Sequence, residues 1–153
     1  IAVPNMAYFL DLVALGTVAD VVPLDRNNLI LVHQGFMRIS KGLCRPCISA
    51  MLRIAGRNPA RAQSSDLGFA VGPRQNAAGR LDDMSRGIEC LLAEVPQQAE
   101  RLAMELDRLN RERREIVAEM KKQAEAVLSS WAPGDGGTLP WGLCLFQKEW
   151  HQG

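Results

Sequence analysis

The run of 35 residues from 96 to 130 contains no glycine and no proline after its first position. Within it, oppositely charged residues recur four positions apart, as in Arg101/Glu105 and Lys121/Glu125, and this spacing places their side chains on one face of a helix. The run therefore predicts a single helix of about 50 Å, which is longer than a small domain needs. Its apolar stripe is narrow and consists of Leu102, Leu106, Leu109, Ile116, Met120 and Val127.

Two roles suit such a helix: it could pair with a second copy in a coiled-coil dimer, or it could connect two domains. The sequence after it favours the connector. Residues 132–137 read Ala-Pro-Gly-Asp-Gly-Gly, which is typical of a linker, and the apolar run 141–146 is typical of a strand that begins a new domain. Helical spacing of apolar residues also recurs in 6–15, 26–40 and 46–55. We therefore expect a mainly α fold.

The chain has 153 residues, begins at Ile1 without a methionine, and stops just after the apolar run. These ends favour a segment of a larger protein. Its composition, 47% hydrophobic and 23% charged, is ordinary for a soluble protein, and no apolar run approaches the roughly 20 residues that cross a bilayer. No secretion signal is visible, so we expect a cytoplasmic protein without membrane contact.

Four cysteines occur, at positions 44, 47, 90 and 144. Cys44 and Cys47 have the spacing of a zinc knuckle or a redox motif, but no second close pair follows them. Cys90 and Cys144 each stand alone in apolar surroundings. We expect neither zinc nor a disulfide, and instead four reduced thiols, buried or half-buried.

The net charge is only +1, but charge is distributed unevenly along the chain. Residues 1–25 carry a net charge of −3, whereas residues 26–90 carry +6. An acidic stretch beside a basic one suits a cation-dependent enzyme that acts on polyanions, because carboxylates hold metal and arginines hold phosphate. The alternative is a surface of mixed sign with ordinary ion pairs, and charge alone favours that alternative.

Residues 72–80, Gly-Pro-Arg-Gln-Asn-Ala-Ala-Gly-Arg, combine the groups that an anion site needs. Arg74 and Arg80 offer planar donors matched to phosphate oxygens, and Asn76 adds a neutral donor. We expect a loop here, with Asn76 as the cap of a short helix whose free N–H groups face the same anion. The alternative is a surface turn with solvated arginines.

Asp20 lies inside the apolar stretch 18–22, after a glycine at position 16 that predicts a hinge. We expect its carboxylate to be at least partly buried, and a buried carboxylate requires a cation or several hydrogen-bond donors. A helix cap or an ion pair with an arginine is the structural alternative to a metal site.

Three stretches together resemble the single-stranded-DNA exonucleases of the DHH phosphoesterase family: residues 15–24, residues 72–83 and the terminal Glu-Trp-His-Gln-Gly of 149–153. The resemblance runs essentially end to end. It implies that residues 1–95 form the C-terminal, helical part of an α/β DHH catalytic domain. Residues 96–130 would be the interdomain connector helix, and residues 131–153 would be a linker with the first strand of the DHH-associated domain.

The resemblance also implies a function. Enzymes of this kind degrade single-stranded DNA from its 5′ end in repair and recombination, with two Mn²⁺ or Mg²⁺ ions, and their further partners include single-strand-binding protein or a helicase. Asp20 matches a catalytic, metal-binding aspartate. Arg74, Asn76 and Arg80 match the phosphate-contacting segment, and His151 matches a histidine near the substrate.

Two departures from the family pattern limit this expectation. Gln75 occupies a position that is usually aliphatic, and the chain has no Asp-x-Asp pair and no Asp-His-His triplet. We therefore expect the isolated segment to be inactive. Three alternatives remain open: a DHH phosphodiesterase of short oligonucleotides, a non-catalytic nucleic-acid-binding module, and a scaffold that dimerises through residues 96–130.

Overall fold

The computed structural model describes residues 5–130 and 142–151, with the side chain of residue 130 excepted. These residues are mainly helical, as the sequence predicts, and no strand occurs among them. None of their helices is long and apolar enough to cross a membrane. The elements are η1 (Met6–Phe9), α1 (Leu10–Ala19), α2 (Arg26–Ser40), α3 (Pro46–Ile54), η2 (Pro59–Arg61), α4 (Ser64–Asp66), the π-helical turn η3 (Leu67–Val71), α5 (Gly72–Leu81), α6 (Ser85–Leu92) and α7 (Pro96–Ser130).

The chain divides into two compact units, Ile1–Asn110 and Arg111–Gly153, and the division falls inside α7. The single long helix predicted for residues 96–130 is confirmed. Its first turns belong to the core of the N-terminal unit, where Ala99, Ala103 and Leu106 are fully buried. That part of α7 is thus a packed core element.

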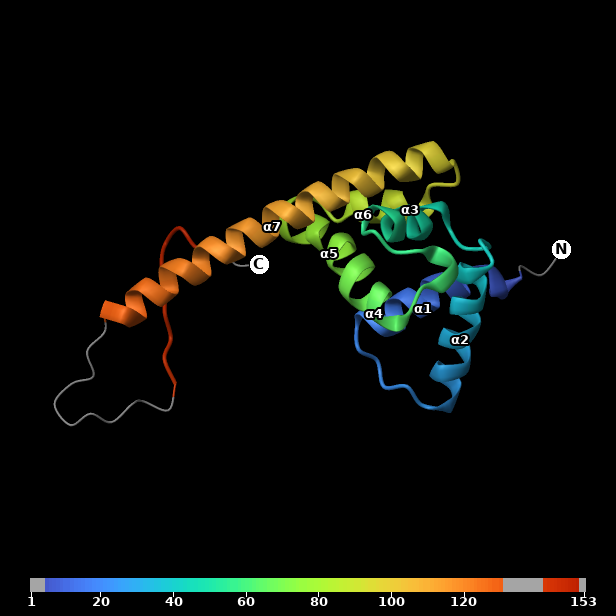
Figure 1. Ribbon diagram of the computed structural model, residues 1–153, viewed down its shortest axis with the longest axis horizontal. Helices are drawn as coiled ribbons and strands as arrows, with labels where there is room; N and C mark the ends of the chain where they lie inside the picture. Colours follow the sequence, from blue (N-terminus) through green and yellow to red (C-terminus); the bar gives the residue numbers. More distant parts are fainter. Residues whose placement is uncertain (1–4, 131–141, 152–153) are drawn as a thin grey trace. The chain divides into compact units, whose positions relative to one another are not determined.

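The N-terminal unit has one hydrophobic core, to which α1, α2, α3, η3, α5, α6 and the start of α7 contribute. Local sequence signals explain where several helices begin. Asp25 caps α2 by accepting a hydrogen bond from the Asn28 N–H (2.8 Å), and Pro46 occupies the first turn of α3. Figure 1 shows α5 lying between α1 and the first part of α7. α5 is therefore held from two sides.

Close packing of α1 against α2 depends on a glycine. A Cβ built on Gly35 would lie 2.5 Å from the Cβ of Ala14 and would also overlap the carbonyl oxygen of Leu10. Only a residue without a side chain permits this approach. The glycine at position 16 behaves differently, because it lies within α1 with open space around it. The hinge predicted there is wrong, and the helix continues to Ala19.

The loop predicted for residues 72–80 is also wrong, because helix runs without a break from Ser64 to Leu81. Pro73 has no N–H, and in a regular helix its ring would collide with the carbonyl four residues earlier. The wider π turn just before it accommodates the proline: the Gly72 N–H donates to the Leu67 carbonyl, five residues back. Asn76 therefore lies inside α5 and caps no helix.

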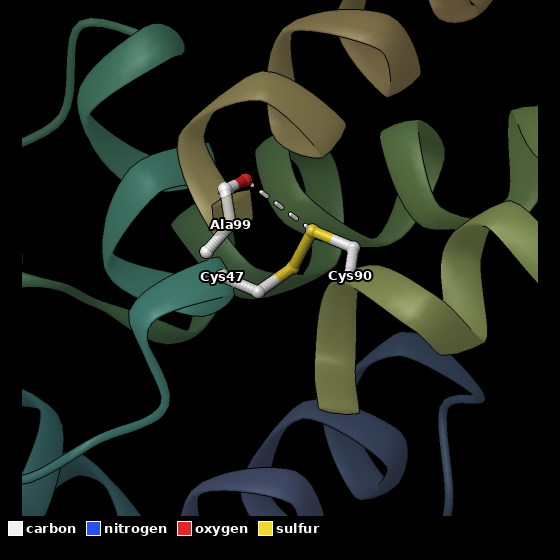
Figure 2. The surroundings of a disulfide bond; sticks show 3 residues. All are labelled: Cys47, Cys90 and Ala99. Atoms are coloured by element: carbon white, nitrogen blue, oxygen red, sulfur yellow. Dashed lines mark hydrogen bonds between the residues drawn. A yellow bond between two sulfur atoms is a disulfide. The ribbon is translucent and has the colours of Figure 1, made fainter. Parts of the chain in front are cut away.

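A disulfide joins Cys47 of α3 to Cys90 of α6, with the two Cα atoms 5.5 Å apart (Figure 2). The expectation of four reduced thiols is therefore wrong for this pair. Both cysteines are fully buried, and the Cys90 sulfur lies 3.8 Å from the carbonyl oxygen of Ala99 in α7. Sequence spacing gave no hint of the pairing, because 43 positions separate residues that only the packing of α3 on α6 brings together.

Within the C-terminal unit, the strand predicted at 141–146 does not form over the part that the structure describes. Residues 142–147 have no regular secondary structure. A strand needs a partner for its backbone groups, and the described residues supply none. The segment is instead anchored by a side chain, since the Trp150 Nε1–H donates to Gln123 Oε1 of α7 at 2.8 Å.

Candidate functional site

Asp20 is the C-cap residue of α1 and is exposed, so the burial expected from its apolar neighbours is wrong. No hydrogen bond or ion pair to its carboxylate occurs among residues 5–130 and 142–151. The C-terminal end of a helix carries partial negative charge from its last carbonyls, which favours a nearby cation. The Asp20 carboxylate is exposed within the described part of the chain, and its role as a metal ligand stays a prediction.

The buried carboxylate near the start of the chain is Asp11, which is only 1% exposed. It accepts hydrogen bonds from the Arg45 N–H at 2.7 Å and from Arg45 Nη1 at 3.0 Å. This pair fastens the start of α3 to α1 and satisfies the charge internally. Asp11 is therefore a structural residue.

The end of α1 packs directly on the helix that carries the predicted phosphate donors. A Cβ built on Gly72 would lie 3.2 Å from the Cβ of Ala19, and one on Gly68 would lie 3.5 Å from a Val18 methyl group. The spacing at Gly72 is tighter than an ordinary side-chain contact, so this glycine permits the close approach of α1, whereas the spacing at Gly68 is that of ordinary packing. Asp20 follows Ala19 directly, so the backbone places it beside the start of α5.

The hydrogen-bond donors of Arg74 point into the N-terminal unit and are bound there by other residues. Its Nε and Nη2 lie 2.9 and 2.8 Å from Oδ1 of Asp107 in α7, and its Nη1 donates to the carbonyl oxygen of Ala70 at 2.7 Å. The Arg74 and Asp107 side chains are 15% and 5% exposed. In this arrangement Arg74 fixes α5 against α7, and its role as a phosphate donor stays a prediction.

Asn76 and Arg80 are exposed and lie four residues apart on one face of α5. Neither side chain contacts a hydrogen-bond or ion-pair partner in the part of the chain that the structure describes. Both are therefore available to an external ligand such as a phosphate group.

Gln75, the position that departs from the family pattern, faces α6. Its Nε2 lies 2.5 Å from where a Cβ on Gly87 would be, so the glycine makes room for the longer polar side chain. Its Oε1 is buried without a hydrogen-bond partner. The departure affects packing and adds no donor to the exposed face of α5.

His151 lies in the C-terminal unit, is exposed, and follows Trp150, which is anchored to α7. The predicted role of His151 as a residue near the DNA substrate stays a prediction. Among the described residues, no three His, Cys, Asp or Glu side chains gather as a metal site.

Sequence reasoning did not identify Asp107 as the ion-pair partner of Arg74. The available signal was its position directly after Leu106 in the apolar stripe, where a carboxylate requires a buried partner.

The chain is similar along its whole length to curated exonucleases. It is 57% identical over 154 residues to the "single-stranded-DNA-specific exonuclease RecJ" of Salmonella typhimurium and 56% identical over 153 residues to that of Escherichia coli. The chain covers 26% of the length of each of these relatives. No protein-family model matches the chain.

Solved structures agree with this similarity. A crystal structure of RecJ with Mg²⁺ from Thermus thermophilus matches 79% of the chain with a TM-score of 0.70 and 30% identity, and the match spans 19% of that protein. A crystal structure of exonuclease RecJ bound to manganese matches 80% of the chain with a TM-score of 0.71, also at 30% identity, over 31% of its own length. The chain therefore matches, over its whole length, a segment of RecJ proteins, and the curated relatives that it matches are single-stranded-DNA-specific exonucleases of which it spans 26%.

Proposed function

We propose that this chain is the segment of a metal-dependent single-stranded-DNA exonuclease that supplies one metal ligand and part of the DNA-binding surface. The contact of Ala19 with Gly72 is the observation that carries the proposal, because Asp20 follows Ala19 directly in the chain and this contact brings the end of α1 to the start of α5. The relatives with bound Mg²⁺ or Mn²⁺ support a cation at that carboxylate.

In this proposal each side chain has one task. Asp20 holds a Mn²⁺ or Mg²⁺ ion through a carboxylate oxygen, a ligand type that both ions favour. Asn76 and Arg80 donate hydrogen bonds to DNA phosphates from the exposed face of α5. Arg74 contacts phosphate from the same helix while its pair with Asp107 holds α5 in place. The two bound ions of the complete enzyme would lower the pKa of a water and stabilise charge on the scissile phosphate.

The proposed roles of the segments follow the same scheme. Residues 1–95 would complete a DHH catalytic domain, residues 96–130 would connect it to the DHH-associated domain, and residues 131–153 would begin that domain. His151 would then contact the DNA from the second domain. The parent enzyme would act from the 5′ end of DNA in cytoplasmic repair and recombination, with single-strand-binding protein or a helicase as further partners.

The isolated segment should be inactive, because Asp20 alone cannot hold two ions. Incubation of the purified 153-residue chain with Mn²⁺ and end-labelled single-stranded DNA should leave the DNA intact. Progressive shortening of the label would contradict this expectation.

The test of the proposed function is the Asp20→Asn variant of the full-length enzyme that carries this segment. We expect a loss of more than roughly 100-fold in the rate of single-stranded-DNA degradation, because the amide carries no charge for the cation. The control is Glu100→Gln, an exposed acid on α7, which should leave the rate unchanged. A rate for Asp20→Asn within twofold of the parent would overturn the proposal.

The basic stretch 26–90 favours one other candidate, a non-catalytic nucleic-acid-binding module. That candidate predicts salt-dependent DNA binding by the full-length protein that changes neither with Asp20→Ala nor with Mn²⁺. A DHH phosphodiesterase would instead prefer short oligonucleotides over long single strands in the same assay.

A further inference from the structure

Asp107 is a charged residue among the core residues of the N-terminal unit. It is 4% exposed, and its neighbours on α7, Ala103, Leu106 and Leu109, are buried as well. Replacing a buried ion pair by apolar residues of similar volume often leaves stability unchanged or raises it. Stability alone therefore does not account for an aspartate at this position.

The contacts of Asp107 lie on one edge of the Arg74 guanidinium. A single oxygen, Oδ1, lies 2.9 Å from Nε and 2.8 Å from Nη2. The third nitrogen, Nη1, donates to the carbonyl oxygen of Ala70 in η3 at 2.7 Å. All three nitrogens of Arg74 are thus held, by one acceptor on α7 and one on the turn that precedes α5.

These contacts fix the direction of the whole guanidinium group. The group is planar and rigid, so holding its three nitrogens also sets the directions of all five N–H groups. Each terminal nitrogen carries two N–H groups and makes one of the contacts above. One N–H on Nη1 and one on Nη2 therefore have no partner in the part of the chain that the structure describes, and an anion can accept hydrogen bonds from them.

We infer that Asp107 is a positioning residue, which holds the Arg74 guanidinium in the orientation that contacts a DNA phosphate. A free arginine side chain samples many rotamers, and ordering it on binding costs affinity. The pair with Asp107 makes that ordering part of the folded state. An apolar residue at position 107 could fill the same space but could not hold the guanidinium. The inference rests on the phosphate contact proposed for Arg74.

The test is the affinity of the full-length enzyme for a fluorescein-labelled oligothymidylate, measured by fluorescence anisotropy in EDTA so that no DNA is degraded. We expect Asp107→Asn to weaken binding by roughly fivefold, because the guanidinium must then be ordered on binding. Electrostatics alone gives the opposite sign, since loss of a negative charge beside a phosphate-binding arginine would tighten DNA binding. The direction of the change therefore separates positioning from simple charge.

Two further variants separate positioning from loss of packing. Leu106→Ala removes a fully buried side chain beside Asp107, so it should lower the Tm yet keep the DNA affinity within twofold of the parent. Asp107→Glu keeps the charge but moves the carboxylate by one methylene group, and we expect binding to weaken by roughly threefold. Asp107→Glu decides the question if Asp107→Asn does not fold.

Arg74→Ala links the inference to the proposed function. It should weaken binding by roughly tenfold and reduce the slope of log affinity against log salt by roughly 0.7, the share of one phosphate contact on single-stranded DNA. Adding Asp107→Asn to Arg74→Ala should cause no further loss, because the residue that Asp107 positions is already absent.

Parental affinity in the folded Asp107 variants, or an equal loss of affinity in Leu106→Ala, would overturn the positioning role. If Arg74→Ala itself keeps the parental affinity and salt slope, the phosphate contact of the proposed function fails too. If Arg74→Ala weakens binding and the Asp107 variants do not, only the positioning role fails, so the two failures are distinguishable.

Discussion

The Cβ of Ala19 lies 3.2 Å from the place that a Cβ on Gly72 would occupy, and this contact joins the end of α1 to the start of α5. An added methyl group would also lie 3.3 Å from the Leu67 carbonyl oxygen, so backbone and side chain would both have to shift. The contact is what relates the proposed cation ligand to the proposed phosphate donors.

Gly72→Ala should therefore destabilise the chain by about 1–3 kcal/mol, the usual cost of overpacking a core contact. Chemical denaturation monitored by circular dichroism measures this free energy of unfolding. Gly16→Ala is the matched control, because Gly16 lies inside α1 with nothing within 4 Å of an added Cβ. There, alanine should stabilise the helix by about 0.5–1 kcal/mol. Equal effects at the two positions would contradict the packing described.

The ion pair between Arg74 and Asp107 should dominate the attachment of α5 to α7. Asp107→Asn leaves the mostly buried Arg74 guanidinium without its counter-charge, and we expect a loss of about 2–4 kcal/mol in the free energy of unfolding. Lys121→Ala removes an exposed pair with Glu125 and should cost less than about 0.5 kcal/mol. Urea titrations of both variants give the comparison, and a similar small loss for each would mean that the buried pair is not formed.

Gln75 should be replaceable by an apolar residue with a gain in stability. Gln75→Met removes the buried oxygen that lacks a partner while it keeps the length of the side chain beside Gly87. We expect a gain of about 1–2 kcal/mol from the removed desolvation penalty. Gln97→Met on the exposed surface of α7 is the control and should change little. A loss of stability for Gln75→Met would show that the amide finds a partner.

The disulfide should be detectable by counting thiols. Without reductant, alkylation of the unfolded chain followed by mass spectrometry should modify only Cys44 and Cys144, the two free cysteines. Four modified cysteines would contradict the Cys47–Cys90 bond. With the disulfide intact, the chain should unfold at a higher denaturant concentration than after reduction. The free energy of unfolding should be larger by about 2–4 kcal/mol.

The two free thiols should also react at different rates in the folded chain. Burial, and then the neighbouring Asp11 charge, raise the pKa of the Cys44 thiol. At pH 8 a smaller fraction of Cys44 is therefore thiolate than for a thiol with the ordinary pKa, and thiolate is the reactive form. Exposed Cys144 should react first with iodoacetamide, and the rate at Cys44 should keep rising above pH 9. Faster labelling of Cys44 at pH 8 would contradict its half-buried environment.

The parts of the fold that depend on local sequence were predictable. The absence of glycine and proline between 97 and 130 predicted α7, and Pro46 marked the first turn of α3. Positions that depend on tertiary packing were not. A glycine and a proline at 72–73 predicted a loop, but the π turn before them lets the helix continue.

In the candidate site, too, the residue types could be predicted from the sequence but their surroundings could not. Residue types pointed to Asp20 and to the segment 72–80, but the burial of these residues depended on partners far along the chain. From the sequence alone Arg74 is expected to be an unpaired cation, because its partner Asp107 lies 33 residues away and comes close only when α5 packs against α7. The apolar neighbours of Asp20 suggested a buried carboxylate, yet the helix ends at Ala19 and leaves Asp20 exposed.

The most direct measurement is an anomalous difference map from crystals of the full-length enzyme with Mn²⁺ and single-stranded DNA. We predict a Mn²⁺ peak within roughly 2.0–2.3 Å of an Asp20 carboxylate oxygen, with a DNA phosphate in hydrogen-bond contact with Arg80 on the neighbouring face of α5. A map in which every Mn²⁺ ion is held by other residues, while Asp20 faces solvent away from the DNA, would contradict the account.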